Sequence, residues 1–120
     1  MTGLDALLVA AGAAVGAPLR YLVNHWLREH LGAAPPAGTL VVNVAGSFVL
    51  GVLVGAGVTG APLALVGVGF CGALTTFSTL ALEVWDAMTD GRRVEATAVV
   101  GLSLVLGVGA AWAGWSLSNR

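Results

Sequence analysis

The segment best suited to chemistry is a stretch rich in glycine and hydroxyl side chains, residues 67–79, inside an otherwise apolar region. Its letters are GVGFCGALTTFST, with three glycines in the first six residues and four hydroxyl side chains in the last five. Hydroxyl groups donate hydrogen bonds, and the ring of Phe77 has a positive edge. This combination favours the binding of a small, hard anion.

Small and polar residues recur at every fourth position of two further apolar regions. They are Thr39, Asn43, Ser47, Gly51 and Gly55 in one region, and Gly12, Gly16, Arg20 and Asn24 in the other. This spacing places each set on one stripe of a helix, and for the glycines it favours close helix packing. Two interpretations stay open for Asn43, a hydrogen bond to another helix or to a passing solute. Arg20 reaches either the membrane interface or a water-filled vestibule.

The remaining reactive side chains lack the partners that catalysis requires. His25 and His30 have no acidic partner and no metal-ligand spacing, and the single cysteine, Cys71, has no nearby base. Glu83 and Asp86 fall at a predicted helix end, where a solvated rim is the simpler interpretation. The sequence therefore predicts a protein that is not an enzyme.

The composition indicates which solvent must surround these groups. The chain has 120 residues, of which 58% are hydrophobic and 9% charged, and its mean hydropathy is +0.93. A soluble domain of this size needs far more polar surface, so a lipid bilayer is predicted as the solvent. The net charge of −1 and the lack of lysine argue against a nucleic-acid partner.

Four apolar stretches are long enough to cross a bilayer, which takes about 20 residues each. We expect one all-α transmembrane domain over residues 1–120, with these spans: about 4–27, 37–59, 62–84 and 94–117. The first span lacks a basic leader and is expected to be a retained helix.

Loops are expected between these spans. They are residues 28–38, a tight turn at Gly60 and Pro62, and residues 86–93. Both termini then lie on one side, and the arginines of the two longer loops place these loops in the cytoplasm by the positive-inside rule.

The third span contains the glycine and hydroxyl stretch, which makes a poor helix. We therefore expect this helix to be broken in the middle of the membrane. Non-helical backbone at that depth is tolerated only where it is buried in protein or lines a cavity, and its freed carbonyl groups can coordinate a cation. The alternative is a kinked but ordinarily packed helix.

These segments resemble a known family of small bacterial membrane proteins, the Fluc or CrcB fluoride channels. The matching pieces are GAPLRY at 16–21, GTLVVNVAGSFVLG at 38–51 and GFCGALTTFST at 69–79. The resemblance extends over essentially the whole chain, with four spans in the same order.

The resemblance implies a dual-topology, antiparallel dimer with two narrow fluoride pathways at the subunit interface. The residues that it assigns to the anion pathway are Asn43, Phe77, Thr39, Ser103 and Arg20, to which Thr79 of the hydroxyl cluster is added. The backbone carbonyls of Gly72 and Thr75 match positions that hold a structural, non-transported Na⁺ at the dimer centre. A buried cation would raise the local potential for an anion.

Three positions depart from the family pattern. A second phenylalanine would fall at Leu80, and a tyrosine and a second serine would fall at Val99 and Gly107. A homodimer would then lack half of the expected aromatic contacts. A heterodimer with a paralogue is therefore a hypothesis beside the homodimer.

The resemblance implies passive fluoride export across a bacterial plasma membrane, which lowers cytoplasmic fluoride and its toxicity. A cation or drug antiporter is the second hypothesis, but it needs a carboxylate inside the membrane, and the acids lie near the predicted helix ends. A scaffold subunit without transport is the third, and it leaves Asn43 without a role.

Overall fold

The computed structural model describes residues 3–32 and 35–120, and all of its regular elements in these ranges are helical. The elements are α1 (Gly3–Leu31), α2 (Pro35–Gly55), α3 (Gly60–Pro62), η1 (Leu63–Cys71), α4 (Gly72–Leu74), α5 (Ser78–Thr89) and α6 (Arg93–Ser118). The stretch η1 has wider, π-type turns. It continues directly from α3 and into α4.

Four of the helical segments are long and apolar enough to cross a membrane. They are Gly3–Leu31, Pro36–Gly55, Gly60–Thr89 and Arg93–Ser118. The predicted all-helical membrane protein with four spans is therefore confirmed. The third of these segments combines α3, η1, α4 and α5, and residues 75–77 within it are not helical.

The first connection is shorter than the sequence suggested. The expected loop at 28–38 is wrong in its extent, because α1 continues to Leu31 and α2 begins at Pro35. Gly32 has a φ of +60°, a left-handed conformation that suits the end of a helix. Proline is compatible with the first turn of a helix, where its missing N–H has no partner to lose.

The other two connections also differ from the expected positions. Residues 56–59 join α2 to α3, and Gly57 there has a φ of +73°. Gly60 and Pro62 therefore belong to the start of the third span, not to the turn. The last turn is confined to residues 90–92.

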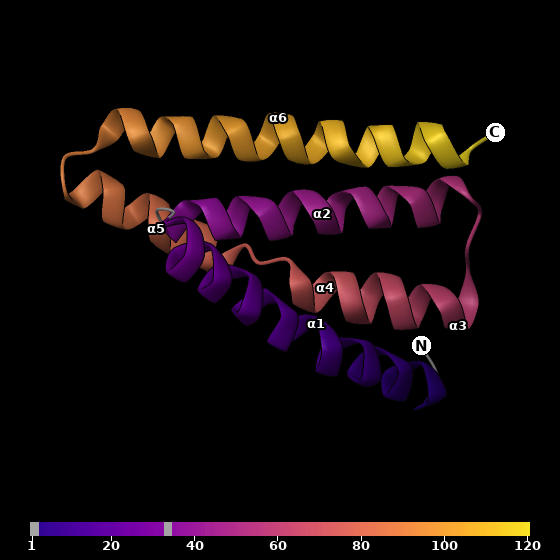
Figure 1. Cartoon of the computed structure of the whole chain (residues 1–120). Coiled ribbons are helices and arrows are strands. Elements are labelled where there is room, and N and C mark those ends of the chain that lie inside the picture. Colours follow the sequence, from indigo (N-terminus) through magenta and orange to yellow (C-terminus); the bar gives the residue numbers. More distant parts are fainter. Residues whose placement is uncertain (1–2, 33–34) are drawn as a thin grey trace.

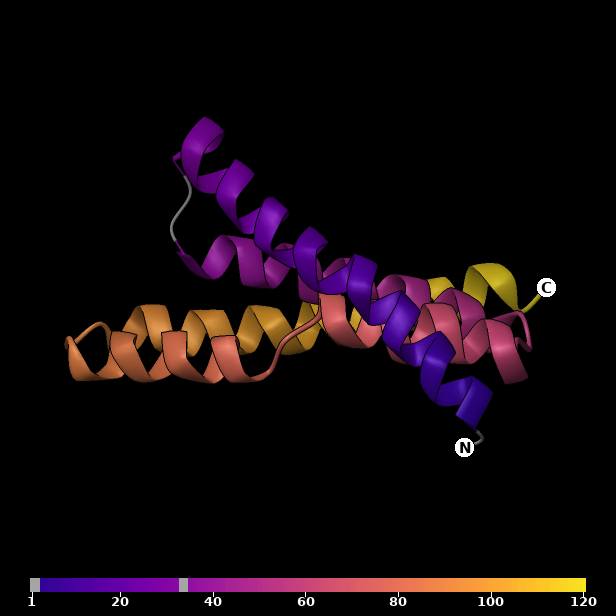
Figure 2. The same cartoon turned by 90° about the horizontal axis from the view of Figure 1, so that it is seen from below.

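The spans run back and forth, so both described ends of the chain lie at the same end of the molecule (Figure 1). The turn between α2 and α3 lies at this end as well, and the turn between α5 and α6 lies at the opposite end. The helices α2 and α6 run side by side, whereas α1 crosses the other helices obliquely (Figure 2).

Glycines let the helices approach closely at two interfaces. A Cβ atom placed at Gly12 or Gly16 of α1 would collide with the backbone of η1, and one placed at Gly51 or Gly114 would collide with backbone across the α2–α6 interface. The predicted use of the glycine stripes for close helix packing is confirmed.

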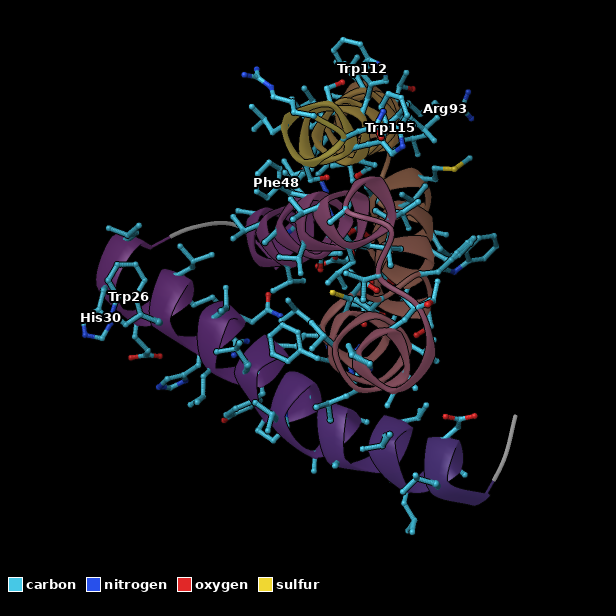
Figure 3. The ribbon with its side chains drawn as sticks, turned by 90° about the vertical axis from the view of Figure 1, so that its right-hand side faces the viewer. Trp26, His30, Phe48, Arg93, Trp112 and Trp115 are labelled. Carbon is cyan, nitrogen blue, oxygen red and sulfur yellow. The ribbon has the colours of Figure 1, made fainter. Side chains whose placement is uncertain are left out.

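The outer faces of the molecule are apolar, as a membrane protein requires. Large exposed side chains include Val94, Leu102, Val105, Val108 and Trp112 on α6 and Leu4, Leu7, Val15 and Leu22 on α1. Trp112 projects away from the bundle in Figure 3. These faces are suited to contact with lipid or with another protein chain.

Candidate functional site

A groove with a volume of about 760 Å³ lies between α2, α5, α6 and the middle of the third span. Its lining is mostly aliphatic side chains and glycines, into which a few polar or aromatic groups are set: Asn43, Ser47, Thr75, Thr76, Phe77 and Ser103. A mostly apolar cleft with few polar groups is typical of a ligand site, because the apolar walls make each hydrogen bond selective. This groove is the candidate functional site.

Part of the polar lining of the groove comes from the non-helical residues 75–77. Thr75 has an extended backbone, with φ −81° and ψ 159°, directly after α4 ends at Leu74. The helical direction resumes at Ser78. The chain in between therefore exposes backbone groups that a continuous helix would use internally.

Asn43 of α2 binds this non-helical backbone through both ends of its amide. Its Oδ1 accepts a hydrogen bond from the Thr76 N–H at 2.7 Å, and its Nδ2 donates to the Thr76 carbonyl at 3.0 Å. Of the two interpretations of Asn43, the structure thus contains the bond to another helix. One N–H of the amide is not used in this pair and remains for another acceptor.

The Thr76 side chain starts the next helix. Its Oγ1 accepts a hydrogen bond from the Thr79 N–H at 3.2 Å and also bonds the hydroxyl groups of Thr79 and Ser78, at 3.2 and 3.3 Å. This is the geometry of a side-chain cap, which satisfies an N–H that the first turn of α5 leaves free. Thr76 was part of the predicted hydroxyl cluster, but its spacing alone gave no sign of this role.

Arg20 of α1 approaches the same backbone from the other side. Its Nη1 donates to the Thr75 carbonyl at 3.4 Å, near the outer limit for a hydrogen bond. Asn24 donates to the Arg20 carbonyl at 3.2 Å, one turn along α1. Arg20 therefore points toward the third span, and not only toward an interface.

The structure brings some of the predicted site residues together. Those that line the groove are Asn43, Phe77, Ser103, Gly72 and Thr75; those placed elsewhere are Thr39, Thr79 and Arg20. No measurement here assigns an ion to any of them, so their roles stay predictions. Among the three departures from the family pattern, Leu80 and Gly107 line the groove.

Two buried hydroxyl groups of the predicted pathway differ in their surroundings. Thr39 is 1% exposed, and its hydroxyl faces the carboxyl group of Glu83. The buried Oγ of Ser103 has no hydrogen-bond partner in the described part of the chain. Buried hydroxyls are normally bonded, so the Ser103 hydroxyl is free to serve a ligand or water.

Glu83 is placed differently from the sequence interpretation. It lies in the middle of α5, which continues to Thr89, and its Oε1 is buried. The interpretation of Glu83 as part of a solvated helix end is therefore wrong, whereas Asp86 is exposed as expected. The error came from placing the end of the third span too early.

The groove is open on the side that this single chain leaves uncovered. Phe77 is 71% exposed although it is aromatic and lies between two membrane-spanning halves. A Cβ atom placed at Gly72 would meet nothing within 4 Å. Residues on this side are therefore accessible to a second chain or to a ligand.

The described residues offer no cluster of the side chains that usually bind transition metals. In residues 3–32 and 35–120 no three His, Cys, Asp or Glu side chains gather closely enough to hold a metal ion. Both histidines are exposed, and His30 stacks on Trp26 with ring centroids 5.3 Å apart, far along α1 (Figure 3). The groove instead is lined by an amide, hydroxyl groups and the side chain of Phe77.

Together, the fold and the groove define a multi-pass helical membrane protein with a mostly apolar cleft, lined by a few polar groups, between its spans. The sequence model of the family described as "CrcB-like protein, Camphor Resistance (CrcB)" matches residues 7–115. The chain belongs to this CrcB family, whose characterised function is that of an ion channel and not of an enzyme.

Individual relatives agree with this assignment. "Fluoride-specific ion channel FluC 1" of Nocardia farcinica is 46% identical over 112 residues, which cover 93% of this chain and 79% of the relative. "Fluoride-specific ion channel FluC 2" of Rhodococcus jostii is 40% identical over 116 residues, or 97% of this chain and 100% of the relative. "Fluoride-specific ion channel FluC 2" of a Synechococcus strain is 42% identical over 117 residues, which cover 97% of this chain and 81% of the relative.

Proposed function

We propose that this protein is a fluoride channel of a bacterial plasma membrane, through which fluoride leaves the cytoplasm passively and its toxicity is reduced. The names of its bacterial relatives support the ion and the activity. The observation that carries the proposal is the groove itself, in which Asn43 and Phe77 from different spans face a common apolar space. An ion that enters such a narrow apolar space loses most of its water. It can cross only if hydrogen bonds from the protein replace those that it made with water.

The proposed anion pathway consists of these side chains: Asn43, Phe77, Thr39, Ser103, Thr79 and Arg20. Fluoride is small and accepts strong hydrogen bonds, so an amide N–H and unpaired hydroxyls are suitable replacements for its water. The unpaired hydroxyl of Ser103 supports this role. Phe77 offers the positive edge of its ring, and Arg20 raises the potential for an anion beside the third span.

We also propose a structural Na⁺ at the backbone of the third span. The Thr76 N–H bonds Asn43 and therefore does not bond the Gly72 carbonyl, which it would reach in a continuous helix. Gly72 and Thr75 would hold the ion through their carbonyl oxygens, and Arg20 leaves one lone pair of the Thr75 carbonyl available. Bound sodium would supply a fixed positive charge, which favours an anion nearby.

The functional unit that we propose is an antiparallel dimer, in which a second chain closes the open side of the groove. The exposure of Phe77 and the open space at Gly72 support a protein contact there. The partner is either a second copy or a paralogue. Leu80 and Gly107 line the groove without offering a ring edge or a hydroxyl, which favours a paralogue that supplies these groups.

Ion efflux from liposomes tests the proposed function. The purified chain is reconstituted with internal fluoride or chloride, and the release of each ion is followed with an ion-selective electrode. We expect fluoride to leave at least about tenfold faster than chloride, a difference in barrier of about 1.4 kcal/mol. Equal rates for the two ions would contradict the proposal.

The same assay separates the two possible partners. Full fluoride efflux from the purified chain alone indicates a homodimer. If the chain alone is inactive, co-purification with a co-expressed paralogue and restored efflux indicate a heterodimer. A chain that is inactive in both preparations argues against the proposed channel.

A further inference from the structure

We infer that Asn43 is a positioning residue that keeps the third span open and frees the Gly72 carbonyl, in addition to any contact with an ion. The inference concerns the backbone of this chain. Its consequence for cation binding rests on the proposed function. The juxtaposition that carries it is the pair of hydrogen bonds between the Asn43 amide and the backbone of Thr76.

The pair replaces a hydrogen bond of the helix. In a continuous α-helix the N–H of Thr76 would donate to the carbonyl of Gly72, four residues earlier. Here it donates to Asn43 Oδ1 at 2.7 Å. Asn43 thus competes with the Gly72 carbonyl for the same donor, and the bond to Asn43 leaves that carbonyl without this N–H.

Burial makes this replacement necessary. Thr76 is 8% exposed, so water does not readily satisfy its N–H and C=O groups if Asn43 is removed. A buried backbone group without a partner costs about 1–3 kcal/mol. Without Asn43, the N–H and C=O groups of Thr76 lose these partners, so the segment opens more readily.

The same pair also fixes how the amide is oriented. The Thr76 N–H requires an acceptor, and the Thr76 carbonyl requires a donor. In a flipped amide the Asn43 NH₂ group would face the Thr76 N–H, and the Asn43 Oδ1 would face the Thr76 carbonyl, so neither pair could bond. The unused N–H of Asn43 therefore has one direction only. One side chain sets both the path of the backbone and the position of a donor.

A second contact from α2 holds the segment in the same place. Gly46 lies one turn beyond Asn43 on this helix, and a Cβ atom placed there would collide with the Thr75 Cγ2. The close approach of Thr75 to α2 brings Thr76 within reach of the amide. Asn43 and Gly46 of α2 thus hold Thr75 and Thr76 together, and we call this contact the clamp. Asn43 is its polar part.

Amide hydrogen exchange on the full chain in lipid nanodiscs tests the clamp directly. We expect the Thr76 amide to exchange at least about tenfold faster in Asn43→Ala than in the wild type, because its N–H loses the acceptor on Asn43. Ser103→Ala is the matched control, because it removes a groove hydroxyl that has no partner. It should leave the Thr76 amide unchanged.

Sodium-dependent stability provides a second, independent readout. The melting temperature is measured in Na⁺ and in a large organic cation, and we expect Na⁺ to raise it for the wild type and Ser103→Ala but not for Asn43→Ala. Unchanged Thr76 exchange together with an unchanged Na⁺ effect in Asn43→Ala would overturn the inference. If the wild type itself shows no Na⁺ effect, the proposed sodium site fails, and accelerated exchange at Thr76 alone decides for or against the clamp.

Asn43→Asp keeps the test informative if the alanine variant fails to fold. Aspartate retains an acceptor for the Thr76 N–H but has no N–H of its own and adds a negative charge. We expect this variant to keep the protection of the Thr76 amide while fluoride efflux falls. Loss of that protection in a folded Asn43→Asp protein would contradict the clamp.

Discussion

At the scale of single residues, Thr76 joins the two halves of the third span. Its backbone bonds Asn43 on α2, and its side chain bonds the first turn of α5. The break is therefore not an empty gap in a helix, because both backbone groups of Thr76 bond to α2 and the Thr75 carbonyl accepts from Arg20 of α1. Such partners let a break persist inside a membrane, where unpaired backbone is costly.

The cap function of Thr76 leads to a prediction for stability. Thr76→Val removes the oxygen that accepts from the Thr79 N–H but keeps the side-chain volume, and loss of such a cap typically costs about 0.5–2 kcal/mol. We expect a lower melting temperature of the purified protein in Thr76→Val and a nearly normal one in Thr76→Ser. A valine variant as stable as the wild type would show that Thr76 is not a cap.

The residue types of this site could be predicted from the sequence, but their partners could not. A glycine and hydroxyl stretch inside an apolar region, and an amide on a small-residue stripe, are visible in the letters alone. The contact between Asn43 and Thr76 depends on how α2 packs on the third span, which no local pattern specifies. Glu83 was misplaced for a different reason. The ends of helices are weakly marked in apolar sequence, so the end of the third span was predicted too early.

At the scale of elements, glycine stripes determine how closely the helices pack. Spacing at every fourth residue predicted this packing because it depends only on helix geometry. The ends of the helices were harder to predict, since α1 and α5 both extend into more polar sequence than a bilayer core requires. Length and hydropathy locate a span, whereas glycines with positive φ locate its end.

Two glycines of α6 provide a matched test of this packing. A Cβ atom at Gly114 would collide with the Phe48 carbonyl, whereas one at Gly109 would meet nothing within 4 Å. We expect Gly114→Ala to destabilise the protein by about 1–3 kcal/mol in thermal unfolding, since overpacking forces the helices apart. Gly109→Ala should be neutral or slightly stabilising, because alanine favours helix. Equal effects would argue against a tight α2–α6 contact.

At the scale of the whole molecule, a single chain encloses the groove on some sides only. The groove is bounded by α2, α5 and α6, while Phe77 on its open side is 71% exposed. A lone exposed phenylalanine between two polar hydroxyl residues has no packing role within this chain. In the proposed dimer its ring edge would face the ion path, which would make the role of Phe77 a property of the assembly.

Fluoride efflux from liposomes that contain Phe77→Ile, compared with Phe48→Ile, tests the central claim most directly. Both changes replace a partly exposed phenylalanine with the same aliphatic residue, but only Phe77 lines the groove. We predict that Phe77→Ile lowers the rate of fluoride efflux at least about tenfold, equivalent to about 1.4 kcal/mol of barrier, while Phe48→Ile stays close to the wild type. Efflux that is unchanged in Phe77→Ile, or reduced equally in both variants, would contradict a fluoride path through this groove.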